Sequence, residues 1–236
     1  MLQAARLLQR ETHSHAGARI HLEKRIPVAA GLGGGSSDAA AALLGLNRLW
    51  DSKLSDAQLV ELAARLGSDV PCFLFPEPFI LGRGRGERCE PLPAAGRLAH
   101  VLVVPGERLS TPAVYAGSSF DLTASKPSIT MVTHALRNGP AMTGLADGLW
   151  NDLEPEAIRR CPIIATIQAH LREVGCLGVG MSGSGTSVFG LCADTTQAHE
   201  MASRIRSLAC REWRVEIVHT EHPSRVTPRG QAAVSR

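Results

Sequence analysis

The sequence lacks the features that mark membrane-spanning and secreted proteins. It has no run of eighteen apolar residues, the least that a membrane-spanning helix needs. The first residues carry Arg6, Arg10 and Glu11 and no apolar stretch, so we expect no signal peptide. No two of the six cysteines lie within four residues of each other, which excludes zinc-ribbon and thioredoxin spacings. These absences predict a cytoplasmic protein with no membrane partner and no metal site of its own.

Aromatic residues and lysine are also scarce. Five Phe, three Trp and one Tyr leave the core to be built from Leu, Val, Ile and Ala. Three lysines stand against 22 arginines, and the formal net charge of +3 is too small to predict a nucleic-acid partner. With 236 residues, 44% hydrophobic and 20% charged, the composition indicates an ordinary folded chain of one large or two small domains.

A glycine-rich loop is the most informative feature that is present. The alternation of apolar residues predicts a strand over 20–26, which Pro27 ends. After the glycines, Ser36–Asp38 are expected to cap a helix over Ala39–Trp50, and Asp38 could alternatively lie near the magnesium of a nucleotide. Backbone N–H groups converge in such a loop and the helix dipole favours an anion, so the pattern predicts a phosphate site.

Other phosphate-binding motifs do not fit this loop. A Walker loop ends in Gly-Lys-Ser/Thr, and no lysine lies between Lys24 and Lys53. A dinucleotide fingerprint that began at Gly31 would need glycine where Ser36 stands. Residues 178–183 match G-x-G-x-x-G, but a predicted strand follows them, so we interpret that match as chance. A flexible linker remains the structural alternative for the loop, although the strand and helix on either side disfavour it.

The order of the other elements predicts the fold class. In the first part we expect helices over 2–11 and 55–67, the second opened by a capping box of Ser55 and Gln58, then Pro71 in the first turn of a helix and a hairpin over 79–92. Ala94–Gly96 is the expected domain boundary. In the second part we expect strands over 100–104, 177–181, 187–192 and 213–219 and helices over 111–115, 129–137, 163–174 and 197–208. Simplified, the second part is β-α-β-β-α-β, the ferredoxin-like order.

Several segments together resemble the GHMP small-molecule kinases. Pro27–Ala42, reading PVAAGLGGGSSDAAAA, is similar to the second motif of that family. The other similar segments follow in the family's order, at Leu66–Phe73, Gly82–Glu87, Ser110–Tyr115, Asn151–Glu154 and Met181–Phe189. The match covers the chain from residue 1 to about 219. The segments are closest to the family member that acts on a diphosphocytidyl sugar alcohol.

The resemblance implies an α+β fold with two domains. Residues 1–96 would form an incomplete ribosomal-protein-S5-domain-2-like domain and 97–220 a ferredoxin-like domain, with a disordered tail over 221–236. The implied reaction moves the γ-phosphate of ATP, bound with Mg²⁺, to the 2-hydroxyl of 4-diphosphocytidyl-2-C-methyl-D-erythritol. This is a step of the non-mevalonate route to isoprenoids. The implied partner is therefore a small molecule, with no nucleic acid and no membrane.

The resemblance also implies the site residues. ATP would be held by Pro27, Val28, Ala29, Ala30, Gly31, Leu32, Gly33, Gly34, Gly35, Ser36 and Ser37. Asp69 would orient or deprotonate the acceptor hydroxyl, although an Asp before a helix is more often a cap. Tyr115 would stack on the cytosine ring, the alternative being an ordinary half-buried aromatic. Gly183, Ser184 and Gly185 would approach the phosphates across the cleft, the alternative being a plain β-turn.

One departure from the family pattern concerns its lysine. Family members carry an early Ala-Lys-x-Asn segment and a later Tyr-His pair, and this sequence has neither. Lys24, Lys53 and Lys126 stand in other contexts. We therefore expect an N-terminally truncated chain that opens inside a helix of the first domain, lacks several strands of the first sheet and has impaired activity, since removed electrophilic groups cost orders of magnitude in rate.

Two alternatives to this kinase remain open. Another GHMP kinase, of mevalonate or homoserine type, is disfavoured by Tyr115 and by the amino-acid sequences of the segments Gly33–Asp38 and Asn151–Glu154. A non-catalytic nucleotide-binding remnant is favoured by the missing lysine segment. The arginines at 83, 85 and 88 suggest RNA binding, but aromatic strand motifs are absent, so solvated side chains are the expectation.

Overall fold

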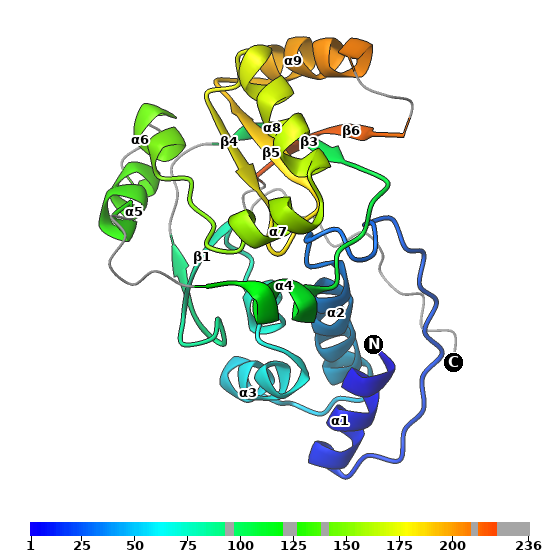
Figure 1. The fold of residues 1–236 in the computed structure, drawn as a ribbon. Coiled ribbons are helices and arrows are strands. Elements are labelled where there is room, and N and C mark those ends of the chain that lie inside the picture. The colour runs from blue at the N-terminus through cyan, green and yellow to red at the C-terminus, as the bar shows by residue number, and fades with distance from the viewer. Residues whose placement is uncertain (93–96, 120–126, 138–141, 209–211, 221–236) are drawn as a thin grey trace.

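The computed structural model describes residues 1–92, 97–119, 127–137, 142–208 and 212–220. A helical part, low in Figure 1, precedes a part built on a four-stranded sheet. The predicted boundary at Ala94–Gly96 and the predicted disordered tail at 221–236 fall outside the described residues. Among the described residues, no helix is both long and apolar enough to cross a bilayer.

The helical part packs four short elements around one apolar core. These are α1 (Leu2–Thr12), α2 (Gly34–Leu49), α3 (Asp56–Leu66) and the 3₁₀ helix η1 (Pro71–Leu74). The predicted capping box is confirmed, since Ser55 Oγ accepts from Gln58 N and Gln58 Oε1 accepts from Ser55 N. The most deeply buried side chains of this core include Leu8, Leu43 and Leu62.

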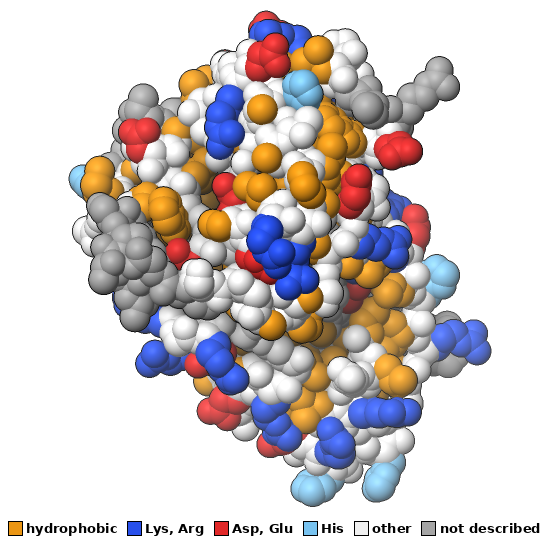
Figure 2. Space-filling model, in the orientation of Figure 1, with side chains coloured by type: hydrophobic (Ala, Val, Ile, Leu, Met, Phe, Trp, Pro, Cys, Tyr) orange, Lys and Arg blue, Asp and Glu red, His pale blue; other side chains and the backbone are white. Residues whose placement is uncertain are grey.

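The predicted strand over 20–26 is wrong. Residues 14–25 have no regular secondary structure, and among the described residues neither sheet includes them. A strand needs a hydrogen-bonding neighbour and a buried face, and within the described parts of the chain this segment has neither. Leu22 is 48% exposed and Val28 is 60% exposed. In Figure 1 the segment runs along the right-hand side of the molecule, and Figure 2 shows hydrophobic side chains at the surface on that side.

The predicted cap of α2 is also wrong. The helix begins at Gly34 rather than Ala39, and its N-cap is Gly33, which adopts the left-handed conformation (φ 62°) without a side-chain cap. Glycine adopts that conformation at no steric cost, so the helix starts earlier and Ser36–Asp38 lie inside its first turns. Ser37 Oγ donates to Gly34 O at 3.0 Å instead of capping.

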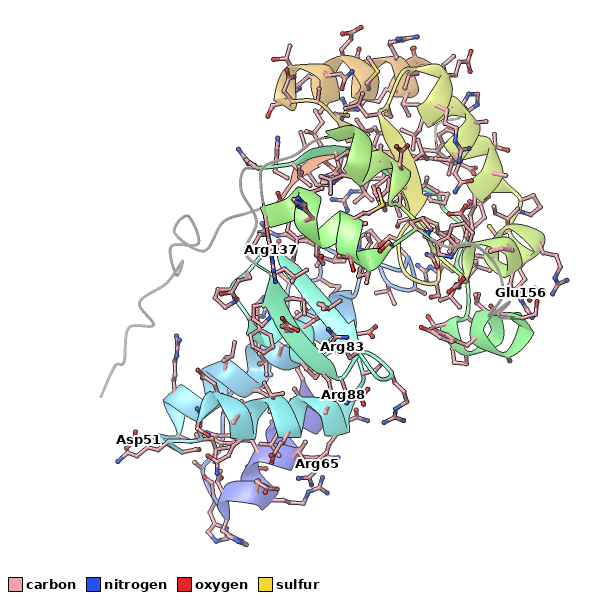
Figure 3. The ribbon with its side chains drawn as sticks, turned by 90° about the vertical axis from the view of Figure 1, so that its left-hand side faces the viewer. Asp51, Arg65, Arg83, Arg88, Arg137 and Glu156 are labelled. Carbon is pink, nitrogen blue, oxygen red and sulfur yellow. The ribbon has the colours of Figure 1, made fainter. Side chains whose placement is uncertain are left out.

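A hairpin links the two parts. β1 (Phe79–Arg83) pairs antiparallel with β2 (Arg88–Leu92), as the sequence predicted. A hydrophobic cluster joins the hairpin to the second part through Phe79, Leu81, Leu92, Leu98, Leu136, Leu145 and Leu191. Because this cluster spans residue 96, a domain boundary there stays a prediction. Arg83, labelled in Figure 3 with Arg88, has a 63% exposed side chain 3.9 Å from Glu90.

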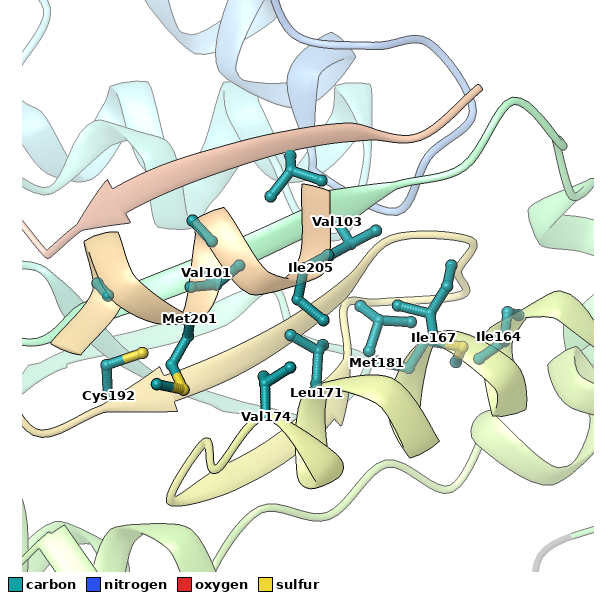
Figure 4. Packing of buried hydrophobic residues seen from close by; sticks show 14 of the residues in the cluster. Val101, Val103, Ile164, Ile167, Leu171, Val174, Met181, Cys192, Met201 and Ile205 are labelled. Atoms are coloured by element: carbon teal, nitrogen blue, oxygen red, sulfur yellow. The ribbon is translucent and has the colours of Figure 1, made fainter. Parts of the chain in front are cut away.

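The second part is a four-stranded antiparallel sheet in the order β4-β5-β3-β6. Its strands are β3 (Ala99–Val104), β4 (Gly178–Met181), β5 (Val188–Cys192) and β6 (Arg214–His219). Helices α8 (Ile163–Glu173) and α9 (Thr195–Leu208) pack on one face of it, where Val101, Val103, Ile167, Leu171 and Ile205 form a buried core (Figure 4). The β-α-β-β-α-β prediction is confirmed, with strand ends within one residue of the predicted ones.

In the described residues between β3 and β4, four helices precede or accompany α8. They are α4 (Thr111–Gly117), α5 (Ile129–Arg137), α6 (Met142–Asp147) and α7 (Glu154–Arg160). The sequence predicted α5 and all but the last two residues of α4, but it did not predict α6 or α7. These two helices span six and seven residues, too short to show a helical period.

Glu156 holds α7 against α4. Its side chain is 7% exposed and accepts hydrogen bonds from Arg159, at 2.7 Å, and from Arg160. A Cβ placed on Gly117 of α4 would lie 2.0 Å from Glu156 Oε1, so the two helices meet at this carboxylate. The hydrogen bonds from the two guanidinium groups, that of Arg159 first, lower the pKa of Glu156 to about 2.

We expect this carboxylate to make stability depend on pH. Because the pKa of Glu156 is lower in the folded state, its contribution is present above about pH 4.5 and is lost as the pH falls toward 2. Glu156→Gln should lower the Tm by several degrees at neutral pH and by much less near pH 3. Glu173→Gln, at a carboxylate 69% exposed, is the matched control and should change little. Calorimetry measures the Tm of each variant at both pH values. Equal losses of Tm at neutral pH and near pH 3 would show that the ionised Glu156 carboxylate does not make the pH-dependent contribution.

Candidate functional site

A cleft of about 820 Å³ lies where the helical part meets the sheet. Segments far apart in sequence line it, namely α1, the glycine loop, the turn after α3, α4 and the turn after β4. The predicted site residues that line it are Pro27, Val28, Ala29, Ala30, Gly31, Leu32, Gly33, Gly34, Gly35, Ser36, Asp69, Tyr115, Gly183 and Ser184. Ser37 and Gly185 are not among the lining residues. Gly185 is buried, and a Cβ on it would contact Met181, Leu109 and Ile164.

The N-terminus of α2 faces this cleft with free hydrogen-bond donors. The first bond of the helix runs from Ser37 N to Gly33 O at 2.9 Å, so the N–H groups of Gly34, Gly35 and Ser36 have no helical acceptor. The helix dipole adds partial positive charge at the same point. The arrangement suits an anion such as a phosphate, as the loop predicted.

Lys24 lines the cleft but is not among the site residues that the sequence predicted. Its Nζ lies 2.5 Å from Asp38 Oδ2, and a Cβ on Gly34 would lie 2.9 Å from that Nζ. The ammonium group therefore sits against the first turn of α2. No arginine is among the described residues that line the cleft, so Lys24 supplies its cationic side chain. The signal available in sequence was the position of Lys24, three residues before Pro27 at the start of the loop.

The glycine loop is in direct contact with the turn after β4. Ser182 Oγ donates to Gly31 O at 2.8 Å, and Ser187 N donates to Ala30 O at 3.2 Å. Gly31 has a φ of 74°, and a Cβ on it would lie 2.1 Å from Ser182 O. A Cβ on Gly183 would in turn lie 2.9 Å from Gly31 O. The structure thus brings the turn to the loop, whereas phosphate binding by the turn stays a prediction.

Asp69 lies on the exposed turn between α3 and η1. It caps no helix, since the N-cap of η1 is Val70 and makes no side-chain hydrogen bond. Ser68 Oγ donates to Asp69 Oδ1 at 3.1 Å, which leaves the second carboxylate oxygen available. Asp69 lines both the cleft and a second cavity of about 480 Å³ beside the hairpin. The position suits a group that meets a ligand, and the capping alternative finds no support.

Tyr115 lines the cleft from α4 and is 56% exposed, and its stacking on a cytosine ring stays a prediction. Thr111, at the start of the same helix, is hydrogen-bonded through Oγ1 to Ser184 Oγ at 2.8 Å. This bond ties the helix that carries the aromatic ring to the turn after β4. Thr111 is not among the site residues that the sequence predicted.

Thiol chemistry is not favoured at Cys72, which lies beside Asp69. Burial, with Cys89 and Asp69 close by, raises the pKa of Cys72 to about 11, so this thiol stays protonated at neutral pH. Its Sγ donates to Asp69 O at 2.8 Å. Within the described parts of the chain, no group of three or more His, Cys, Asp or Glu side chains could hold a metal ion.

Comparison with known proteins places the chain in a family. Family models described as the GHMP kinases N terminal domain and the GHMP kinases C terminal match residues 1–77 and 133–209. The chain is 46% identical over 204 residues to a Pelotomaculum thermopropionicum protein, 4-diphosphocytidyl-2-C-methyl-D-erythritol kinase; the match covers 86% of this chain and 70% of that protein. The chain belongs to the GHMP kinase family. An Enterococcus faecalis enzyme of the same name is 40% identical, over 89% of this chain and 73% of its own.

Solved structures agree with the GHMP kinase fold. A crystal structure of 4-(cytidine 5'-diphospho)-2C-methyl-D-erythritol kinase superposes with a TM-score of 0.74 at 36% identity, covering 91% of this chain and 76% of its own. A homoserine kinase from Cytophaga hutchinsonii, at 18% identity and a TM-score of 0.63 over 84% and 68% of the two chains, shares the fold. The predicted α+β fold with N- and C-terminal GHMP kinase parts is confirmed. The N-terminal match contains the loop and Asp69, and the C-terminal match contains the turn after β4.

Proposed function

We propose that this GHMP kinase binds ATP in the cleft and transfers the γ-phosphate to the 2-hydroxyl of 4-diphosphocytidyl-2-C-methyl-D-erythritol. The reaction is a step of the non-mevalonate route to isoprenoids. The proposal is supported by relatives of that name at 39% to 46% identity. The observation that carries it is the meeting of an anion-binding helix N-terminus, a lysine and an unpaired carboxylate oxygen in one cleft.

In this proposal the phosphates lie at the start of α2. The N–H groups of Gly34, Gly35 and Ser36 donate to phosphate oxygens, and Lys24 offsets their charge. Phosphoryl transfer needs positioning and charge stabilisation above all, which this end of the cleft supplies. An incoming anion would compete with Asp38 for the Lys24 ammonium group.

Asp69 is proposed to act on the acceptor hydroxyl. Its free carboxylate oxygen accepts the hydroxyl proton while the hydroxyl oxygen attacks the γ-phosphorus and the bond to the β-phosphate oxygen breaks, so that ADP leaves. Tyr115, which lines the cleft from α4, is proposed to stack on the cytosine ring. Gly183 and Ser184 would face the phosphates opposite the loop.

Magnesium fits this cleft as an ion bound chiefly by phosphate. Mg²⁺ usually takes one or two carboxylates, together with substrate phosphates and water. Asp38 and Asp69 are the carboxylates that line the cleft. When bound, the ion neutralises charge on the phosphates.

The proposal is tested by nucleotide binding and by turnover. Calorimetric titration with Mg-ATP measures binding, and ADP release with the cytidyl substrate, with mevalonate or with homoserine measures the reaction and the acceptor. Release that depends on the cytidyl substrate supports the proposal, and release with another acceptor identifies another GHMP kinase activity. ATP binding without release supports a nucleotide-binding remnant and the expectation that the missing Ala-Lys-x-Asn segment impairs activity. Absence of ATP binding overturns the proposal.

Gly35 offers a test of the phosphate subsite in which stability and binding change in opposite directions. A Cβ on Gly35 meets nothing within 4 Å, and the residue is helical and exposed to the cleft. Gly35→Ala should therefore stabilise the free protein by up to about 1 kcal/mol, because alanine favours the helix. The methyl group stands where a phosphate would approach, so we expect ATP affinity to fall about tenfold or more. Thermal melting checks the expected gain in stability, and ATP titration checks the expected loss of affinity. Unchanged ATP affinity would contradict the phosphate subsite.

A further inference from the structure

Asn151, which precedes α7, makes three hydrogen bonds with one side-chain amide. Its Nδ2 donates to Gly183 O at 2.8 Å and to Met181 O at 3.0 Å. Its Oδ1 accepts from Leu153 N at 3.0 Å. Only one orientation of the amide satisfies all three partners, because two of them are carbonyl oxygens and the third is an N–H. The side chain is therefore held on both sides.

The segment Asn151–Glu154 makes hydrogen bonds to the end of β4 and to the turn that follows it. Glu154 Oε2 accepts from Met181 N at 3.2 Å, while Asn151 holds Met181 O, so both backbone polar groups of that residue are bound. Asn151 also holds Gly183 O inside the turn. The turn in turn contacts the glycine loop through the bond from Ser182 Oγ to Gly31 O. A continuous set of hydrogen bonds thus runs from Asn151 to the loop.

We propose that Asn151 is a positioning residue of the nucleotide subsite, which fixes the turn Ser182–Gly185 against the glycine loop. The inference rests on the proposed function for the identity of the ligand, ATP. Asn151 itself is not among the residues that line the cleft, so it acts through the turn. Without it, Met181 O and Gly183 O lose their donors and the turn loses its register with Gly31.

The position requires a donor, which makes the aspartate variant informative. In Asn151→Asp a carboxylate oxygen would lie about 2.8 Å from the Gly183 carbonyl oxygen, and two acceptors repel at that distance. Protonation would give the carboxyl one O–H to donate there, so the defect should shrink as the pH falls. Asp152 and Glu154 are the titratable groups on the same segment, and neither residues 182–187 nor residues 28–33 contain one. The wild-type protein carries the same titratable neighbours. The ratio of the ATP affinities of variant and wild type at each pH therefore isolates the effect of position 151.

Asn47 provides a matched control with the same chemistry outside the cleft. Its Nδ2 donates to Leu54 O at 3.1 Å and its Oδ1 accepts from Leu54 N at 3.1 Å. Asn47→Asp should therefore lower the Tm, as loss of such a bond does anywhere, and leave ATP affinity unchanged. A variant at position 151 that acted only through general stability would behave like the Asn47 variant.

The experiment measures Mg-ATP affinity and hydrogen–deuterium exchange in wild type, Asn151→Asp, Asn151→Ala and Asn47→Asp. At about pH 8, both position-151 variants should bind ATP about ten- to a hundredfold more weakly than wild type. Near pH 5, Asn151→Asp should bind ATP within a few-fold as tightly as wild type, whereas the loss of affinity in Asn151→Ala should be the same as at pH 8. In the absence of nucleotide, both variants should exchange faster than wild type over residues 182–187 and 28–33.

The outcomes separate this inference from the proposed function. If wild type does not bind ATP, the proposed function fails, and the exchange measurement still decides whether Asn151 holds the turn and the loop together. Unchanged exchange over 182–187 in the position-151 variants would overturn the inference. Equal losses of ATP affinity in Asn151→Asp and Asn47→Asp, or an Asn151→Asp defect that ignores pH, would also overturn it.

Discussion

Asp69→Asn is expected to lower turnover with the cytidyl substrate by about a hundred- to ten-thousandfold, which is the range that a positioned proton acceptor contributes. Asparagine has the same shape and can still accept from Ser68 Oγ, now 3.1 Å from the carboxylate. It cannot take a proton from the acceptor hydroxyl. The affinity for ATP without Mg²⁺ should change little, because the proposed phosphate contacts lie on α2 and Lys24. Single-turnover ADP release and ATP titration separate the two effects.

Asp51→Asn is the matched control for this variant. Asp51 has an 80% exposed side chain 3.4 Å from Lys53, and Figure 3 shows it at the far end of the helical part. Its φ of 48° is one that asparagine tolerates well, so the control should fold and turn over like wild type. If Asp69→Asn kept turnover within a few-fold of wild type, Asp69 would not be the proton acceptor. If wild type turned over rapidly, the expectation that the missing lysine segment impairs activity would be wrong.

Gly31→Ala is expected to separate the loop from the turn after β4. The new Cβ would lie 2.1 Å from Ser182 O and 2.8 Å from Gly185 O, both of them backbone atoms that cannot rotate away. The φ of 74° adds a backbone cost of about 1–2 kcal/mol for any residue with a Cβ. Together with overpacking, we expect a loss of about 3 kcal/mol or more in the free energy of unfolding. ATP affinity should fall at least about a hundredfold, because the loop and turn no longer meet.

Gly45→Ala controls for the same substitution within α2. A Cβ on Gly45 meets nothing within 4 Å, and the residue lies in the helix interior, away from the residues that line the cleft. We expect a gain of about 1 kcal/mol in stability and no change in ATP affinity. Denaturant unfolding and ATP titration check both variants. A Gly31→Ala protein as stable as wild type would contradict the contact between loop and turn.

Much of the fold follows from local sequence signals. The Ser55–Gln58 capping box, the hairpin over 79–92 and the β-α-β-β-α-β order are properties of short segments, whose periodicity and end signals lie within a few residues of each other. The glycine loop followed by a helix likewise predicted an anion site, because converging N–H groups depend only on local backbone. The segments that resemble the GHMP kinases pointed to the family that the comparisons then showed.

Other features depended on which segments meet in space. The alternation over 20–26 is typical of a strand, yet a strand forms only beside another strand, and the described sheets do not include it. Gly33 starts α2 early because its left-handed conformation is compatible with the packing of the loop, where a Cβ on Gly33 would lie 2.6 Å from the ring of Phe73.

The sequence by itself determined the family, the fold class and most of the segments that line the cleft. Only the tertiary structure decided that Lys24 lies against the first turn of α2, and that Asn151 reaches Gly183 across thirty-two positions of sequence. The sequence does not show which group a polar side chain will contact, because its hydrogen bonds depend on where distant backbone atoms lie in the folded chain. Backbone conformation is largely local, whereas the contacts that align a loop, a turn and a carboxylate in one cleft are set by packing.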